Sequence, residues 1–424
     1  MVRVYKIISF SIVILLIAVL FAGAVTVPAA AQTDTVQFRY NPQHTGDYSP
    51  VAGSETGKLT WSFKTGNYVG GAPAAVNGVV YIGSDDGNVY ALNATTGAKL
   101  WNFTTGGYVG SSPAVVNDVV YVGSFDHNVY ALNATTGAKL WNFTTGGQVD
   151  SSPAVVNGVV YVGSLDHNVY ALDAATGAKV WNFTTADKVF SSPAIANDVV
   201  YVGSLDNNIY ALNAIAGTKL WNFTTGSSVF SSPAVANGVV YVGSWDKNVY
   251  ALNATTGAKV WNFTTGSRVF SSPAVANGVV YVGSDDGNVY ALNATTAAKL
   301  WNHTTADKVF SSPAIANGVV YVGSFDHNVY ALNATTGTTL WNHTTGSRVY
   351  ASPAIANGVV YVGSVDHNIY AIGNAAPAPS QGTSNAAPAP SQGAPPDVLV
   401  MLVFVGLIFV GLVIAAYAVK TYRY

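Results

Sequence analysis

The stretch Ser111–Gly146 reads SSPAVVNDVVYVGSFDHNVYALNATTGAKLWNFTTG and decides the fold. It contains four short runs rich in β-branched and aromatic residues, namely SPAVV, VVYVGS, NVYAL and AKLWNFTT. The segments between these runs are Asn-Asp, Asp-His-Asn and NATTG, whose residue types tolerate the backbone dihedrals of tight turns. The stretch therefore predicts four antiparallel strands joined by turns.

The same pattern recurs every 40 residues, without insertions, from about Lys58 to Ile372. One tryptophan marks each repeat, and we expect it to dock in the structure: Trp61, Trp101, Trp141, Trp181, Trp221, Trp261, Trp301 and Trp341. Four antiparallel strands in such a period are typical of a β-propeller blade. A solenoid is the structural alternative, but no repeat contains a convincing helix and no polar capping repeat ends the array.

The two ends of the repeat array complement each other. Complete four-strand units start at Gly71, Ser111, Ser151, Ser191, Ser231, Ser271 and Ser311. The eighth unit starts at Ala351 and lacks its tryptophan strand, whereas an isolated tryptophan strand, Lys58–Lys64, precedes the first unit. Joining the two closes a ring and removes both open sheet edges. We therefore predict an all-β, eight-bladed propeller of four-stranded antiparallel blades over residues 58–372.

The N-terminal end of the chain is apolar. In residues 1–31, Arg3 and Lys6 precede a long apolar stretch, and Ala29–Ala31 offers a small-residue cleavage pattern. This arrangement predicts a secretory signal peptide, with an uncleaved N-terminal anchor as the alternative.

The C-terminal end predicts a tether. Residues 398–419 contain no charged side chain, and at about 1.5 Å per residue a helix of this length crosses a bilayer core. The basic residues of the tail 420–424 then lie in the cytoplasm. Residues 373–397 are rich in Pro, Ala, Ser and Gln and predict an extended stalk, and residues 32–57 form a lead segment before the propeller. We expect the propeller, residues 58–372, to stand outside the cell on this single-pass helix.

Composition excludes several kinds of chemistry. The chain of 424 residues has no cysteine, so it can form no disulfide framework, thiolate metal site or cysteine nucleophile. All 20 acidic residues but only 14 of the 18 basic residues lie between the two apolar ends. A mildly acidic body without a basic stripe argues against nucleic acid as the main partner.

The run ALNATTGAKLW at Ala91–Trp101 recurs with small changes in the following units, each time after a VYVGSxD segment. These motifs resemble the pyrroloquinoline-quinone-type (PQQ-like) β-propeller repeat and its tryptophan-docking pattern. The resemblance covers about three quarters of the chain. It implies the propeller fold but not one activity, because the family includes quinone-dependent dehydrogenases and also cofactor-free scaffolds such as the outer-membrane assembly propeller.

The resemblance does not carry over any catalytic residue. It implies a calcium ion held by glutamate, asparagine and aspartate, a catalytic aspartate, and a vicinal disulfide against the quinone. This chain has no cysteine, its only glutamate is Glu55 outside the repeats, and no unit has an inserted loop. We therefore expect no enzyme activity and no cofactor. A PQQ-dependent oxidoreductase remains the alternative on family resemblance alone, with PQQ and calcium as its cofactors.

Two repeated residue types need a structural interpretation. One aspartate per unit follows the second strand: Asp86, Asp126, Asp166, Asp206, Asp246, Asp286, Asp326 and Asp366. A single carboxylate per blade is too few for a calcium shell of about 6–8 oxygens, so we expect these aspartates to bind turn backbone. Histidine follows the aspartate in four units. Because blades pack about 10 Å apart and zinc binds imidazole at about 2 Å, we interpret these histidines as turn residues.

Asn-X-Thr sequons are frequent in the repeats. The candidate N-glycosylation sites are Asn93, Asn102, Asn133, Asn142, Asn182, Asn222, Asn253, Asn262, Asn293, Asn302, Asn333 and Asn342. On an exported chain this number favours several occupied sites. The alternative is that NATTG is only a turn and NFTT only an edge strand.

Differences between the repeats concentrate in two connections, the link into each blade and the hairpin between its second and third strands. In a four-stranded antiparallel blade these two connections emerge on one face of the ring, which we call the varied face. It collects aromatic and charged residues, the mixture that binding surfaces use. The candidate binding residues there are Trp245, Lys247, Arg268, Phe270, Lys188, Phe190, Lys308, Phe310, Arg348, Tyr350, His127, His167, His327 and His367.

Near-identical blades suit a multivalent or structural part better than a one-site catalyst. The sequence therefore predicts an exported, membrane-tethered propeller that acts as a non-catalytic binding or scaffold module with a surface protein or glycan as partner. An envelope assembly scaffold is the further alternative.

Overall fold

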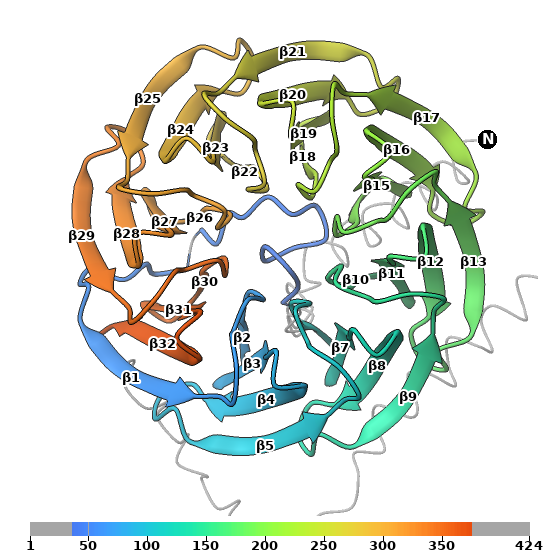
Figure 1. Cartoon of the computed structure of the whole chain (residues 1–424), viewed down its shortest axis with the longest axis horizontal. Helices are drawn as coiled ribbons and strands as arrows, with labels where there is room; N and C mark the ends of the chain where they lie inside the picture. Colours follow the sequence, from blue (N-terminus) through green and yellow to red (C-terminus); the bar gives the residue numbers. More distant parts are fainter. Residues whose placement is uncertain (1–35, 50, 375–424) are drawn as a thin grey trace, which may run out of the picture. The chain divides into compact units, whose positions relative to one another are not determined.

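The computed structural model describes residues 36–49 and 51–374, and these residues form a β-propeller (Figure 1). Eight separate four-stranded antiparallel sheets surround a central channel. The prediction of an eight-bladed all-β propeller is confirmed. The predicted signal peptide, membrane-spanning helix and tail lie outside the described residues, as does the predicted stalk except for Gly373, which ends β32, and Asn374. Within the described ranges, no helix is long and apolar enough to cross a bilayer.

Each blade runs from a short inner strand at the channel to an outer strand at the circumference. The inner strands are β2 (Ala74–Val76), β6 (Ala114–Val116), β10 (Ala154–Val156), β14 (Ala194–Ala196), β18 (Ala234–Ala236), β22 (Ala274–Ala276), β26 (Ala314–Ala316) and β30 (Ala354–Ala356). The second strands are β3 (Val79–Gly83), β7 (Val119–Gly123), β11 (Val159–Gly163), β15 (Val199–Gly203), β19 (Val239–Gly243), β23 (Val279–Gly283), β27 (Val319–Gly323) and β31 (Val359–Gly363).

The third and outer strands complete the blades. The third strands are β4 (Asn88–Asn93), β8 (Asn128–Asn133), β12 (Asn168–Asp173), β16 (Asn208–Asn213), β20 (Asn248–Asn253), β24 (Asn288–Asn293), β28 (Asn328–Asn333) and β32 (Asn368–Gly373). The outer strands are β5 (Lys99–Thr104), β9 (Lys139–Thr144), β13 (Lys179–Thr184), β17 (Lys219–Thr224), β21 (Lys259–Thr264), β25 (Lys299–Thr304), β29 (Thr339–Thr344) and β1 (Leu59–Lys64).

The hydrophobic core lies between neighbouring blades. The second and third strands are buried on both faces, because each blade is covered by the next one, and this explains their nearly continuous apolar sequence. Between blades one and two, for example, Tyr81 and Val89 of one blade cluster with Val120, Val122 and Leu132 of the other. Equivalent clusters fill the other interfaces, including the one between blades eight and one.

The first strand of the chain closes the ring. β1 pairs with β32 in an antiparallel ladder in which Trp61 lies opposite Ala371 and Phe63 opposite Ile369. The last sheet therefore has the order β1-β32-β31-β30, so blade eight contains both ends of the propeller. The predicted strand closure is confirmed.

Each tryptophan docks on the following blade. The Nε1–H of Trp101 donates a hydrogen bond to the carbonyl of Ala134 at 2.9 Å. Its indole covers Gly137, where φ is 71° and an added Cβ would lie 2.7 Å from the ring. Glycine is therefore needed both for the left-handed turn and for the close approach of the indole. Trp61 makes the equivalent bond to Ala94 at 2.9 Å and thereby joins blade eight to blade one.

The lead segment replaces a turn that blade eight lacks. Trp341 of blade seven donates to the carbonyl of Ser54 at 3.1 Å and lies against Gly57. The hydroxyl of Tyr321 donates to the same carbonyl at 3.0 Å. Ser54 and Gly57 precede Trp61 at the spacing by which Ala134 and Gly137 precede Trp141. The sequence analysis left residues 53–57 in the lead segment, although this spacing marks them as the last turn of the ring.

The rest of the lead segment runs through the central channel (Figure 1). It accepts one backbone N–H from the inner strand of each of blades two to seven. The acceptors are Val36 for Val115, the side chain of Gln37 for Val155, Pro42 for Ile195, Gln43 for Val235, Thr45 for Val275 and Gly46 for Ile315, at 2.7–2.9 Å. The guanidinium of Arg39 is buried here and donates to the carbonyls of Ser272 and Pro313. The segment thus satisfies inner-strand amides that would otherwise face the channel.

Serine hydroxyls link the blades around the channel. In seven of the eight interfaces, a backbone N–H donates a hydrogen bond to a serine Oγ of the next blade, at 2.8–3.0 Å. The donor–acceptor pairs are Ala72–Ser112, Ser112–Ser152, Ser152–Ser192, Ser192–Ser232, Ser232–Ser272, Ser272–Ser312 and Ser312–Ser352. Between blades eight and one the series stops, because position 72 is alanine.

Candidate functional site

The hairpins and links of the varied face are bonded to one another. In blade two, the N–H of Phe125 in the hairpin donates to the carbonyl of Tyr108 in the link at 2.8 Å. The carboxylate of Asp126 accepts hydrogen bonds from Gly106 N–H and from the Tyr130 hydroxyl, both at 2.7 Å. Burial raises the pKa of Asp126, but these bonds and those from Asn128 outweigh burial and leave the pKa below its usual value. This aspartate holds the hairpin together.

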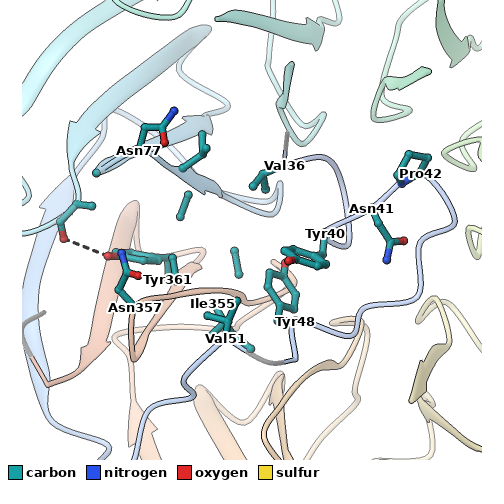
Figure 2. Close-up of a pocket in the computed structure, with 16 residues that line it drawn as sticks. Val36, Tyr40, Asn41, Pro42, Tyr48, Val51, Asn77, Ile355, Asn357 and Tyr361 are labelled. Carbon is teal, nitrogen blue, oxygen red and sulfur yellow. Dashed lines mark hydrogen bonds between the residues drawn. The ribbon is translucent and has the colours of Figure 1, made fainter. Parts of the chain in front are cut away.

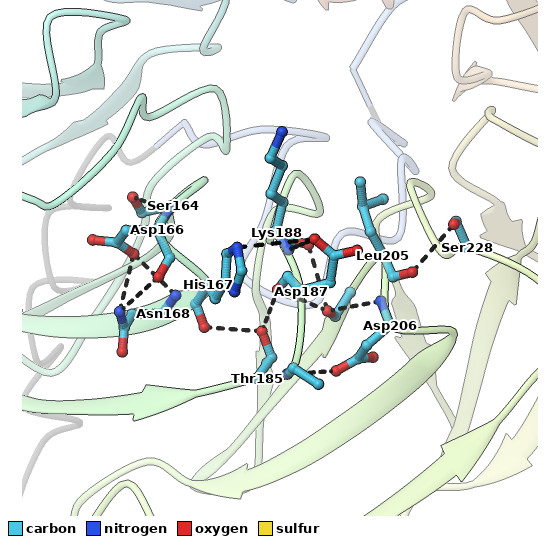
Figure 3. Close-up of polar contacts among 12 residues, drawn as sticks. Ser164, Asp166, His167, Asn168, Thr185, Asp187, Lys188, Leu205, Asp206 and Ser228 are labelled. Atoms are coloured by element: carbon cyan, nitrogen blue, oxygen red, sulfur yellow. Dashed lines mark hydrogen bonds and ion pairs between the residues drawn. The ribbon is translucent and has the colours of Figure 1, made fainter.

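The four turn histidines lie apart, on different blades. His127, His167, His327 and His367 adopt φ of 73–77° in the hairpin, the position that glycine, asparagine or Lys247 occupies in other blades. Figure 3 shows the environment of His167, whose Nε2 lies 3.9 Å from a carboxylate oxygen of Asp187, while Lys188 extends away from these contacts. Among the described residues, no group of three or more His, Asp or Glu side chains could hold a metal ion.

Aromatic rings of blades four to eight form a continuous cluster on the varied face, which we call the aromatic arc. Its members are Phe190, Phe230, Trp245, Phe270, Phe310, Phe325 and Tyr350. Neighbouring rings have centroids 4.3–5.8 Å apart, and Phe230 stacks on Trp245 at 4.3 Å. Most of these rings are only partly buried. They therefore offer an aromatic surface to solvent at the mouth of the channel.

Cationic side chains lie over this arc. The guanidinium of Arg268 lies 4.7 Å from the Trp245 ring centroid, and that of Arg348 lies 5.4 Å from the Phe325 ring. The Lys308 ammonium lies 6.0 Å from the Phe310 ring. Of the sequence-predicted set, the structure brings together in or over the arc Trp245, Arg268, Phe270, Phe190, Lys308, Phe310, Arg348 and Tyr350. Lys247 is exposed in the hairpin turn, where its carbonyl accepts a hydrogen bond from the N–H of Thr265, the residue after the outer strand β21.

Blades one to three break this pattern. The link residue that is aromatic in blades four to eight is Gly70, Gly110 and Asp150 in these three blades. A pocket of 450 Å³ opens there, and we call it the glycine pocket. Its lining combines tyrosine and phenylalanine rings with Asp85, Asp150 and Arg348. The sequence analysis missed it, because the pocket needs blades eight and one side by side.

A second pocket of 490 Å³ lies on the opposite face, inside the ring (Figure 2). It lies where the lead segment leaves the inner strands of blades eight and one uncovered. Tyr40 and Tyr48 of the lead segment have ring centroids 4.8 Å apart there, and Ile355 and Asn77 come from the two blades.

The sequon asparagines occupy two environments. Asn102 and its equivalents are exposed on the outer strands, where the Nδ2 of Asn102 donates to Asn88 at 3.0 Å. Asn93 and its equivalents end the third strands, where the Oδ1 of Asn93 accepts the N–H groups of Thr95 and Thr96 at 3.0 Å. In both environments the side chain serves the fold, and glycan occupancy stays a prediction.

Family models match most of the propeller. The model described as "Beta-alanine-activating enzyme, beta-propeller" matches residues 44–237 and, in a second overlapping placement, 116–317. The model described as "Outer membrane protein assembly factor BamB" matches residues 307–376. The chain is a PQQ-like β-propeller repeat protein. No curated protein matches it in sequence.

Solved propellers share the fold of this PQQ-like repeat protein. BamB from Moraxella catarrhalis is 20% identical, with a TM-score of 0.66 over 75% of this chain and 99% of BamB. The computationally designed Ika8 protein is 19% identical, with a TM-score of 0.69 over 75% of this chain and all of Ika8. The quinohemoprotein alcohol dehydrogenase from Comamonas testosteroni is 17% identical, with a TM-score of 0.70 over 82% of each chain. At these identities the likeness shows the fold alone.

The residues that the resemblance implies for a quinone and its calcium ion do not match this chain. No cysteine is present, and the single glutamate of the sequence, Glu55, lies in the turn that precedes β1. The repeated aspartates, such as Asp126, are already bound to hairpin backbone and tyrosine hydroxyls. We therefore derive no catalytic step from this site.

Proposed function

We propose that this PQQ-like propeller is an exported, membrane-tethered binding module that docks a surface protein or glycan on the aromatic arc. The observation that carries the proposal is the contiguity of partly exposed rings and cations across five blades. Aromatic rings supply large contact area at low entropic cost, and arginine adds a charge with directional hydrogen bonds.

The repeat itself supports a functional rather than a packing origin for the arc. Residues inside the blades must be nearly identical because they fill identical interfaces. The arc lies outside those interfaces, and blades one to three show that the ring closes with glycine or aspartate at the same position. The rings of the arc are therefore not needed to complete the fold.

The test compares variants of the secreted body, residues 32–397, as bait for native membranes and for an array of immobilised glycans. We expect wild type to retain a partner that Arg268→Ala and Trp245→Ala lose, with an unchanged melting temperature for Arg268→Ala. Lys247→Ala is the matched control, because this cation lies on the same hairpin as Trp245 but outside the arc. Equal retention by Arg268→Ala and wild type would show that the arc is not the docking surface. Retention from native membranes and binding to the glycan array distinguish a protein partner from a glycan partner.

A further inference from the structure

The glycine pocket exists because two links lack side chains. At Gly70, an added Cβ would meet no atom within 4 Å, so the space above this residue is open. At Gly110, an added Cβ would lie 2.5 Å from the Oδ1 of Asp150. Glycine at position 110 thus gives room to the carboxylate, and glycine at position 70 leaves room for something else.

Aromatic rings form the walls of this pocket. Tyr68 and Tyr108 come from the links of blades one and two, and Tyr350 comes from the link of blade eight. Phe125 stands beside Tyr108, with ring centroids 5.9 Å apart. The volume of 450 Å³ suits a ligand of the size of an aromatic amine.

The charged groups of the pocket are not paired with one another. Neither carboxylate, Asp85 or Asp150, accepts a hydrogen bond from another described residue, and neither forms an ion pair within the described ranges. Asp86 beside them is bound within its hairpin by Gly66 and Tyr90. Arg348 lines the same pocket, but its guanidinium lies over the Phe325 ring and forms no ion pair with either acid within the described ranges. The two carboxylates therefore lack a paired cation.

We propose that the glycine pocket binds a small organic ammonium ion, in which the ammonium pairs with Asp85 and Asp150 and an apolar body packs against the aromatic walls. Rings of tyrosine and phenylalanine attract a cation through their negative faces, and two carboxylates add direct charge pairing. The pocket adjoins the aromatic arc, with which it shares Tyr350, but its acids and glycines lie outside the arc, so the proposal goes beyond the binding function proposed for the arc.

Protonation of the acids should control this site. Burial, and after it the neighbouring Asp85 carboxylate, raises the pKa of Asp150 to about 6. Burial, followed by the Asp86 carboxylate, also raises the pKa of Asp85. A bound cation stabilises both ionised forms, so binding should be strongest above pH 7 and should weaken as the pH falls through about 6. The other titratable side chains that line the pocket are Arg348, Tyr68, Tyr108 and Tyr350.

The experiment titrates 2-phenylethylamine, its neutral analogue 2-phenylethanol and a peptide with one lysine into the secreted body by calorimetry. We expect the amine to bind at pH 7.5 at least about tenfold more tightly than the alcohol and more weakly at pH 5. Asp150→Asn should lower the affinity for the amine at least about tenfold, because it removes a negative charge. Gly70→Phe should lower this affinity by a similar factor, because it fills the pocket with the side chain that blades four to seven carry at this position. Asp285→Asn, at the hairpin position of Asp85 but three blades away around the ring, is the matched control and should bind like wild type.

Three results would overturn the proposal: equal binding of the amine and the alcohol, unchanged affinity of a folded Gly70→Phe variant, or binding of the lysine peptide alone. The last result would assign the pocket to a protein side chain. Melting temperatures identify variants that fail to fold. The binding test of the aromatic arc with native membranes and immobilised glycans reports separately on the proposed function.

Discussion

At the scale of single residues, Ala72 interrupts the series of serine hydroxyls around the channel. Every other blade presents a serine Oγ to the backbone N–H of the preceding blade, as Ser152 does for Ser112 at 3.0 Å. Alanine has no hydroxyl, so the N–H of the half-buried Ser352 has no such acceptor in blade one. An unmade hydrogen bond at an amide partly shielded from water costs stability.

We predict that Ala72→Ser raises the free energy of unfolding by about 0.5–1.5 kcal/mol, the usual net contribution of one hydrogen bond. Ser152→Ala, which removes an existing bond at an equivalent interface, should lower stability by a similar amount. Chemical denaturation of the secreted body measures both changes. A serine at position 72 that destabilises the ring would show that the interface between blades eight and one differs from the others in shape as well as in sequence.

The contacts of the hairpin aspartates could be predicted from the sequence in part, whereas those of the glycines in the glycine pocket could not. The hairpin role of Asp126 was predictable, because an aspartate in a tight turn bonds to local backbone and each blade repeats that local geometry. The carboxylate also receives Gly106 N–H and the Tyr130 hydroxyl, which no local turn rule supplies. The glycine pocket was not predictable, since Gly70 gains its neighbours only when blade eight closes against blade one.

At the scale of strands, β1 holds the ring closed by two means. Its ladder with β32 covers a sheet edge, and its tryptophan docks on the turn of blade one. The preceding residues Ser54 and Gly57 receive the tryptophan of blade seven. Both sides of blade eight therefore depend on the N-terminal segment.

Deletion of residues 58–64 should lower the melting temperature and expose β32 as an open edge. Loss of the buried Trp61 alone costs about 3–5 kcal/mol, and loss of the strand ladder adds to that. Trp61→Ala separates the docking contribution from the ladder, and Trp101→Ala gives the same loss within a complete blade. Scanning calorimetry and sedimentation measure the effect. A truncated body that stayed monomeric with an unchanged melting temperature would contradict closure by β1.

At the scale of the whole molecule, the number of blades followed from sequence because the repeat is strictly 40 residues long and its two end fragments complement each other. The path of the lead segment did not follow. Most of its hydrogen bonds join backbone atoms, as between the carbonyl of Pro42 and the N–H of Ile195. Such bonds do not depend on the type of side chain, so no sequence pattern predicts them.

The predicted membrane tether gives a test at this scale. A chain that ends at Asp397 should appear in the culture medium, because the only predicted C-terminal span, residues 398–419, is then absent. The full chain should sediment with membranes. Fractionation followed by immunoblotting measures the distribution, and a truncated chain that still sediments would indicate that residues 1–31 remain as an uncleaved anchor.

Nearly identical blades carry little information about how many of them a ring should contain, since any blade can pack on any other. Residues 36–49 reach the inner strands of blades two to seven one after another, and Ala52 then reaches Gly358 of blade eight. The contour length of this thread therefore fits one circumference. If the gene gained or lost one 40-residue unit, this N-terminal segment would be too short or too long for the new ring. The segment therefore favours a ring of eight blades.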